Sequence, residues 1–114
     1  MHEYPITQQI IKIAEKHAAD AGASCVKKIN LVVGDYSGFV GDSIDMYFRI
    51  ISQGTACEGA DIEIKRIKPK VKCNVCGDLF ERKPFSFDCP KEGCHGLGEP
   101  TEVGKEFFIE SIEI

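Results

Sequence analysis

Apolar residues in the first part of the chain recur at the spacing of a helix. Between residues 5 and 21 they lie three or four positions apart, which predicts a helix with one buried face. Pro5 suits the first turn of such a helix, and Gly22 favours its end. The predicted apolar stripe consists of Ile6, Ile10, Ile13, Ala14 and Ala21.

A strand, a second helix and a second strand are predicted next. Residues 27–33 and 60–68 alternate in the pattern of half-buried strands, whereas residues 42–54 return to helical spacing. Asp42 is predicted to cap this helix, with Asp45 three residues on as in a capping box. The residues predicted to be buried in these elements are Ile29, Leu31, Val33, Ile44, Tyr47, Phe48, Ile51, Ile62, Ile64 and Ile67.

Four of the six cysteines lie in one short segment further on. Cys73 and Cys76 have two residues between them, Cys89 and Cys94 have four, and twelve residues separate the two pairs. Two such pairs supply the four thiolates that a tetrahedral metal requires, and zinc is the usual occupant. Iron in a rubredoxin-like site is the alternative. The other two cysteines, Cys25 and Cys57, are predicted to be small buried hydrophobic residues.

The order of these elements predicts the fold class. A last alternating segment at residues 106–114 forms a third strand, after the cysteine segment. We therefore expect a two-layer α+β fold, in which two helices cover a small three-stranded mixed sheet. Residues 1–68, completed by the strand at 105–114, form one α/β domain in this prediction. Residues 69–104 form an inserted lobe similar to a zinc ribbon.

Composition and charge exclude some classes of protein. The net charge of −4 and the balance of five basic and four acidic residues between Lys70 and His95 argue against binding to nucleic acid or anionic membrane. This weakens the main alternative function, a zinc-ribbon module for nucleic-acid or protein interaction. No apolar run approaches the length of a membrane span, and the N-terminus does not have the pattern of a signal peptide. We expect the protein in the cytoplasm.

The first three residues form a second candidate metal site. The amine of Met1, the amide nitrogen of His2 and the imidazole of His2 can bind one metal in small chelate rings. The backbone or carboxylate of Glu3 can supply a fourth ligand. Nitrogen-rich, nearly planar donors suit Ni(II) or Cu(II). The alternative is a frayed terminus that begins with Met-His by chance.

These motifs together resemble the HypA/HybF family of hydrogenase-maturation nickel chaperones. The resemblance implies a nickel-binding α/β domain and a zinc-binding lobe. It also implies transfer of Ni(II) to the hydrogenase large subunit of a [NiFe]-hydrogenase with a nickel-delivery GTPase, and in some organisms a role with urease accessory proteins. The sequence contains no nucleophile–base pairing and no phosphate loop, so we expect no enzymatic activity. The matching segments are Met1-His2-Glu3 and residues 34–38, 54–60, 73–76, 86–90 and 110–114.

One spacing differs from the family pattern. The family usually has two residues between the cysteines of the second pair, whereas four separate Cys89 from Cys94 here. A spacing of four still occurs among zinc ligands. His95, which follows Cys94 directly, is an alternative for the fourth ligand. Two other interpretations are that it faces the nickel end of the molecule, or that it is an exposed loop histidine without a role.

Overall fold

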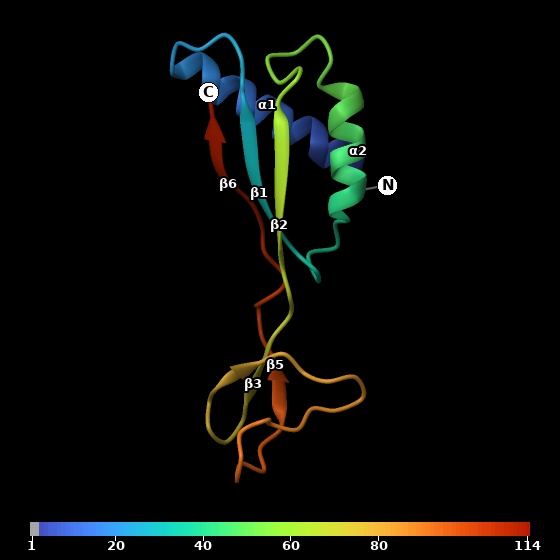
Figure 1. Cartoon of the computed structure of the whole chain (residues 1–114), viewed down its shortest axis with the longest axis vertical. Helices are drawn as coiled ribbons and strands as arrows, with labels where there is room; N and C mark the ends of the chain where they lie inside the picture. The colour runs from blue at the N-terminus through green and yellow to red at the C-terminus, as the bar shows by residue number, and fades with distance from the viewer. Residues whose placement is uncertain (1–2) are drawn as a thin grey trace.

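The computed structural model describes residues 3–114, which form two lobes joined by two chain segments (Figure 1). The molecule is 57 Å long and only 28 Å and 16 Å across. Its radius of gyration of 18.3 Å exceeds the roughly 13 Å of a compact chain of this length. The two lobes therefore do not share one core. The predictions for Met1 and His2 lie outside the described residues.

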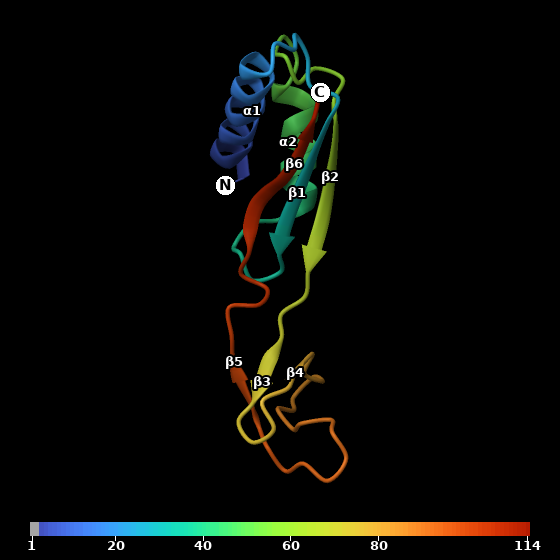
Figure 2. The same ribbon diagram turned by 90° about the vertical axis from the view of Figure 1, so that its left-hand side faces the viewer.

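The larger part, here called the helix–sheet lobe, has the predicted two-layer α+β architecture. Its sheet has the order β2-β1-β6, in which β1 runs parallel to β2 and antiparallel to β6. The two helices lie on one face of this mixed sheet (Figure 2). The elements are α1 (Glu3–Asp20), β1 (Lys28–Gly34), α2 (Gly41–Ile51), β2 (Asp61–Ile67) and β6 (Phe107–Glu113).

The core lies between this sheet and the helices. The face predicted for β1 is confirmed, since Ile29, Leu31 and Val33 are buried in the core. Val32, on the opposite face, is also buried, so burial does not alternate along the whole strand. The buried face predicted for α2 is also confirmed at Ile44 and Phe48. The fully buried core residues are Ile10, Ile11, Ala14, Ala18, Val26, Ile29, Leu31, Val33, Ile44, Phe48 and Cys57.

The stripe predicted for α1 is wrong in part. Ile13 is 51% exposed, and the buried face is rotated to the neighbouring row of side chains. Thr7 can join this face because its hydroxyl donates to the carbonyl of Glu3 at 2.5 Å. Apolar residues occupy both rows, so packing against the sheet and α2 selects the face. The buried residues of α1 are Thr7, Ile10, Ile11, Ala14 and Ala18.

The predicted cap of α2 is also wrong. The helix begins at Gly41, its N-cap residue is Val40, and no side chain caps it. Asp42 lies inside the first turn instead, where its carboxylate is favourable near the positive end of the helix dipole. The helix ends at Ile51, three residues before the predicted glycine stop.

A bulge in β6 breaks the predicted alternation. Leu31 pairs with Ile109 and Asn30 pairs with Ser111, so Glu110 has no partner on β1. The extra residue lets Ile109 and Ile112, three positions apart, both pack against the core. Strict alternation would have pointed one of them to the opposite face.

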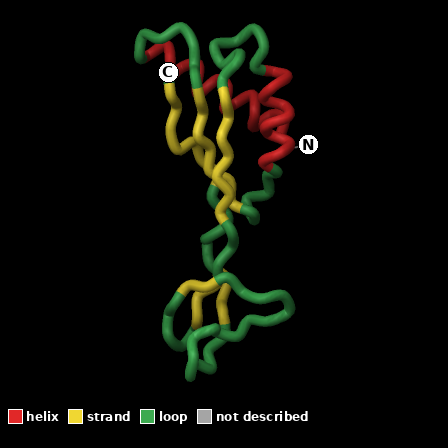
Figure 3. The backbone as a smooth tube through the Cα atoms, in the orientation of Figure 1, coloured by secondary structure: helices red, strands yellow, loops and turns green. Residues whose placement is uncertain are grey.

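The smaller part, here called the cysteine lobe, contains a second sheet with the order β4-β3-β5. Its strands are β3 (Val71–Cys73), β4 (Leu79–Phe80) and β5 (Gly98–Pro100). Most of the lobe is loop, as Figure 3 shows. Of its described residues, Cys73 and Phe80 are the only buried hydrophobic ones. So small a core cannot hold the lobe together without a further cross-link.

The loop that follows β1 bonds to both segments that connect the lobes. The N–H of Asp35 donates to the carbonyl of Ile67 at 2.9 Å, on the way into the cysteine lobe. The N–H of Tyr36 donates to the carbonyl of Gly104 at 2.7 Å, on the way back. Gly34 lies so close to Gly104 that a Cβ atom there would collide with its carbonyl group. These contacts fix the start of both connections against the helix–sheet lobe.

Candidate metal centres

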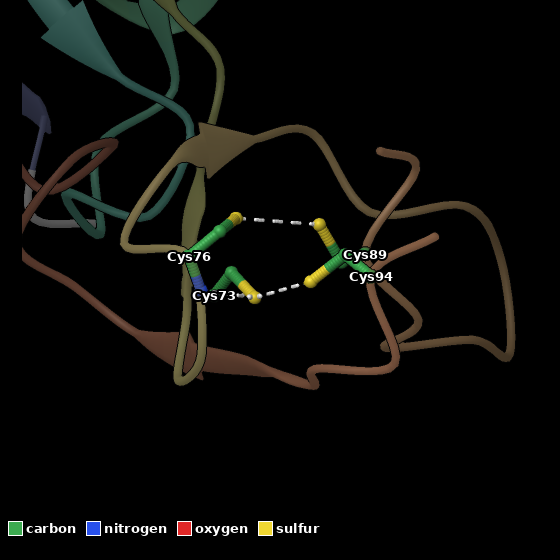
Figure 4. A group of neighbouring side chains, drawn as sticks. All are labelled: Cys73, Cys76, Cys89 and Cys94. Atoms are coloured by element: carbon green, nitrogen blue, oxygen red, sulfur yellow. Dashed lines mark hydrogen bonds between the residues drawn. The ribbon is translucent and has the colours of Figure 1, made fainter. Parts of the chain in front are cut away.

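The structure brings all four clustered cysteines together in the cysteine lobe (Figure 4). The sulfur atoms of Cys73 and Cys94 are 3.6 Å apart, and those of Cys76 and Cys89 are 3.7 Å apart. All four sulfurs lie within 4.8 Å of one another. Around a tetrahedral zinc with bonds of about 2.3 Å, neighbouring sulfurs would be about 3.8 Å apart. The arrangement fits such a metal, and the sulfur distances are far too long for disulfides.

The turn after β3 positions Cys73 and Cys76 as metal ligands and stabilises the thiolate of Cys73. Gly77 has a φ of 78°, which permits the tight turn, and the N–H groups of Val75 and Cys76 donate to the sulfur of Cys73 at 3.4 Å each. The N–H groups of Cys76 and Val75 lower the pKa of Cys73 from 9.0 to about 6. Cys73 is therefore suited to be a thiolate at neutral pH.

The thiols of Cys76 and Cys89 do not ionise as readily beside this thiolate. The N–H of Lys91 lowers the pKa of Cys89, but burial and the neighbouring sulfurs outweigh it and raise the value to about 12. The N–H of Asp78 likewise lowers the pKa of Cys76, but burial and Cys73 raise it overall. Several thiolates this close together need a positive charge among them. A divalent cation would supply that charge and hold all four as ligands.

Cys94, and not His95, lies with the other three cysteines. The side chain of His95 is exposed and does not belong to the group of potential ligands found within residues 3–114. The longer spacing of the second pair is accommodated by a turn, in which the N–H of Cys94 donates to the carbonyl of Lys91 at 3.0 Å. Gly93, with a φ of 80°, allows the chain to reach this position.

Gly96 is a part of this site that the sequence did not indicate. It is buried between the two cysteine pairs, and its carbonyl accepts the N–H of Cys89 at 3.1 Å. A Cβ atom at this position would collide with the sulfur of Cys73 and lie 3.1 Å from Val75. Its φ does not require glycine, so the need arises only from contacts between distant segments.

At the N-terminus the structure describes Glu3 but not the other two predicted nickel ligands. Glu3 begins α1, and its carboxylate accepts the N–H of Val40, the N-cap residue of α2, at 3.2 Å. The ring of Tyr4 packs edge-on against Tyr47 of α2, with ring centroids 5.4 Å apart. These contacts anchor the beginning of α1 beside α2. The sequence did not indicate the role of Val40, because a backbone donor leaves no signal in residue type.

The two remaining cysteines differ from each other. Cys57 is buried as predicted, and burial, together with Glu15, raises the pKa of its thiol to about 11. The prediction that Cys25 is buried is wrong, because this side chain is exposed in the loop before β1. Across residues 3–114 no second group of three or more potential metal ligands occurs.

A helix–sheet lobe with an anchored N-terminal helix, together with a separate lobe built around four thiols, defines a small two-lobed metal-binding protein. A family model described as "Hydrogenase/urease nickel incorporation, metallochaperone, hypA" matches residues 1–114. The chain belongs to this family, as the sequence predicted. Metallochaperones carry metal and are not enzymes. No helix in the described part of the chain is long and apolar enough to cross a membrane.

Individual relatives agree with this assignment. The hydrogenase maturation factor HypA of Dehalococcoides mccartyi is 43% identical over 114 residues, which cover 100% of this chain and 94% of that protein. The hydrogenase maturation factor HypA of Caldanaerobacter subterraneus subsp. tengcongensis is 37% identical over 115 residues, covering 100% and 99%.

Two solved structures share the fold. The solution structure of a HypA protein superimposes with a TM-score of 0.70 at 24% identity, covering 100% of this chain and 96% of that one. The solution structure of the Ni metallochaperone HypA from Helicobacter pylori gives a TM-score of 0.63 at 23% identity, covering 98% and 96%.

Proposed function

We propose that the chain binds Ni(II) at its N-terminus and delivers it for the maturation of a [NiFe]-hydrogenase. The match of the nickel-incorporation metallochaperone family to residues 1–114 carries this proposal. That family description covers both hydrogenase and urease. The names of the relatives with 43% and 37% identity, both hydrogenase maturation factors, favour hydrogenase as the recipient.

In the proposed nickel site, the ligands are the amine of Met1, the amide and imidazole nitrogens of His2, and the backbone of Glu3. We assign the backbone rather than the carboxylate of Glu3 because one oxygen of the carboxylate already accepts the N–H of Val40. As the first residue of α1, Glu3 has a backbone nitrogen that no helical hydrogen bond requires. Four nitrogen donors of this kind suit Ni(II).

We propose zinc as the metal of the cysteine lobe, with Cys73, Cys76, Cys89 and Cys94 as ligands. Four closed thiolates are typical of a structural zinc site, and the sulfur distances of 3.6 and 3.7 Å support it. Zinc would stabilise the lobe by cross-linking its two halves. Metal analysis of freshly purified protein distinguishes zinc from iron, because an iron–thiolate site is coloured and a zinc site is not.

The proposed partners follow from the same function. They are a nickel-delivery GTPase, the hydrogenase large subunit and, as a second recipient, the urease accessory proteins. The net charge of −4 supports a role without nucleic acid or membrane. We place this function in the cytoplasm.

Calorimetric titration with Ni(II) tests the N-terminal site. The comparison uses zinc-loaded protein with a free Met1 amine, the same protein with one glycine added before Met1, and His2→Ala. Each change removes a proposed ligand, so each should weaken nickel binding at least about tenfold and leave zinc content unchanged.

His17→Ala is the matched control. This histidine is exposed on α1 and belongs to neither proposed site, so its loss should leave nickel affinity unchanged. If the glycine-extended protein bound Ni(II) as tightly as the native one, the amine would not be a ligand. If His2→Ala also bound Ni(II) as tightly as the native protein, the N-terminal site would have to be abandoned.

A further inference from the structure

A groove lies where the two lobes meet, and none of the four clustered cysteines lines it. Its volume is about 430 Å³, within the range of pockets that bind ligands. The segments that connect the lobes form one side, and the loops of the cysteine lobe form the other. Apolar parts of Pro69, Val71, Phe87 and Val103 line much of it. The groove is therefore suited to hold an apolar side chain.

Positive charge gathers around this groove in a chain whose net charge is −4. Lys68, Lys70, Arg82 and Lys105 line it, and Glu81 is the one acidic residue among the lining side chains. An isolated apolar pocket would give no indication of its ligand. Four cations and one carboxylate in the same lining indicate a ligand with negative charge.

Among the described residues, three of these cations have no carboxylate partner. Within residues 3–114, Lys68 and Lys70 form no ion pair, whereas Lys105 pairs with Glu102 at 3.4 Å. The guanidinium of Arg82 lies 4.5 Å from the centre of the Phe87 ring and donates only to backbone carbonyls. These charges are available to a partner.

The spacing of the lysines favours a peptide over a small anion. Lys68 and Lys70 are two residues apart in a non-helical connection, and in an extended chain such positions are about 6.6 Å apart. Acidic residues at alternate positions of an extended peptide have the same separation. Inorganic phosphate would instead favour a cradle of N–H groups at a helix N-terminus, and none of the lining residues belongs to a helix.

The apolar surface continues beyond the groove. Phe87 also lines a neighbouring depression with Phe85 and Leu97. Phe85 is fully exposed and is the only described residue other than glycine with a positive φ, 60°. Unusual backbone conformations cluster at functional sites, and contiguous exposed apolar patches mark interaction surfaces. A ligand longer than the groove would find further apolar contacts here.

We propose that this groove docks an extended acidic segment of a partner protein. Lys68, Lys70 and Arg82 bind its carboxylates, and the apolar floor beside Phe87 takes one of its hydrophobic side chains. The inference goes beyond nickel binding and does not depend on the N-terminal site. A protein that bound no nickel would still dock such a segment.

Fluorescence anisotropy with a defined peptide tests this proposal. The probe is a labelled heptapeptide of alternating Glu and apolar residues, Glu-Leu-Glu-Phe-Glu-Leu-Glu, titrated with the zinc-loaded full chain at about 0.15 M salt, where the Debye length is about 8 Å. We expect saturable binding that weakens when Gln replaces every Glu. The variant Lys68→Glu with Lys70→Glu should weaken binding about tenfold, because two exposed ion pairs become repulsive contacts.

The matched control changes the charge equally elsewhere. Lys12→Glu with Lys27→Glu replaces two exposed lysines of the helix–sheet lobe that form no ion pair with any described residue. It should change peptide affinity less than about twofold, because screening weakens distant exposed charges. Equal weakening by both double variants would overturn the proposal in favour of general charge attraction.

Two further results would overturn the assignment of the ligand. One is the absence of saturable binding by the acidic peptide. The other is displacement of the peptide by inorganic tripolyphosphate at equal concentration, which would identify a site for small anions. Amide shifts in an NMR titration should be confined to residues 68–71, 82–87 and 101–105. Shifts centred elsewhere would place the peptide on another surface.

Discussion

Gly96→Ala should disrupt the cysteine site without removing a ligand. The added Cβ would overlap the sulfur of Cys73 and lie 3.1 Å from both Asn74 Oδ1 and Val75 Cβ. To restore ordinary contact, the sulfur or the loop would have to move by about 1 Å. Zinc sites tolerate changes of only about 0.2 Å in ligand distance. The variant should therefore lose one good metal–sulfur bond.

The size of the effect follows from the strength of such sites. Structural zinc sites contribute about 10 to 16 kcal/mol, so one of four ligands contributes about 3 kcal/mol. Zinc affinity should fall about a hundredfold or more. The main-chain φ of Gly96 is not in the left-handed region, so alanine causes no backbone strain there. A loss of zinc affinity can therefore be attributed to the clash of the added Cβ.

Competition with a chromophoric zinc chelator measures this affinity. Gly96→Ala, Cys94→Ala and His95→Ala would be compared with the unchanged protein. Cys94→Ala should lose zinc at least as strongly as Gly96→Ala. His95→Ala should keep it, because the exposed imidazole lies outside the group of sulfurs. Unchanged zinc affinity in Gly96→Ala would refute the close packing of Gly96 against Cys73, and with it the geometry described for the site.

Three further predictions concern the fold. Removing the metal of the cysteine site with a chelator should collapse the amide NMR signals of residues 71–100 into the narrow range of a disordered chain, while β1, β2 and β6 persist, because Cys73 and Phe80 are the only buried hydrophobic residues described in the cysteine lobe. An ordered metal-free lobe would contradict this. Phe48→Ala should lower the free energy of unfolding by about 3 to 5 kcal/mol in urea titrations, since Phe48 is 1% exposed, whereas Met46→Ala on the same helix, 51% exposed, should cost less than about 0.5 kcal/mol. Burial raises the pKa of Cys57 from 9.0 to about 11, so its neutral thiol stabilises the fold fully below pH 9 and this contribution is lost as the pH rises to about 11. The unchanged protein should lose more stability than Cys57→Ala across that range, and equal losses would refute the assignment.

The spacing of residues along the chain was enough to predict most of the helices and strands, and the cysteine site. The periodicities of residues 5–21, 27–33 and 42–54 predicted the helices and the central strand. They could do so because a helix or strand places its apolar side chains at intervals set by backbone geometry alone. Paired cysteines predicted a metal site for the same reason, since each pair lies on one short turn. The N-terminal motif and the cysteines together predicted the family, which the match to residues 1–114 confirmed.

Contacts between distant segments were decided only by the tertiary structure. The sequence could not select which apolar row of α1 is buried, because both rows are rich in isoleucine and alanine. Nor could it indicate the bulge at Glu110, which depends on the register of β6 against β1. The N–H of Val40 that binds Glu3 is a backbone group, and Gly96 has an ordinary φ, so neither leaves a local signal.

The same distinction applies to the cysteine site and the groove. The spacing of the cysteines predicted that all four belong to one site. Whether Cys94 or His95 lies with the other three depended on how the turn at Gly93 brings the chain back towards Cys73. The groove between the lobes joins residues 68–71 to residues 100–105, which approach only because the chain leaves the larger sheet and returns to it. Backbone geometry within a few residues is encoded by nearby residue types. Contacts across the molecule depend instead on packing and on the sum of many weak interactions, which no local pattern records.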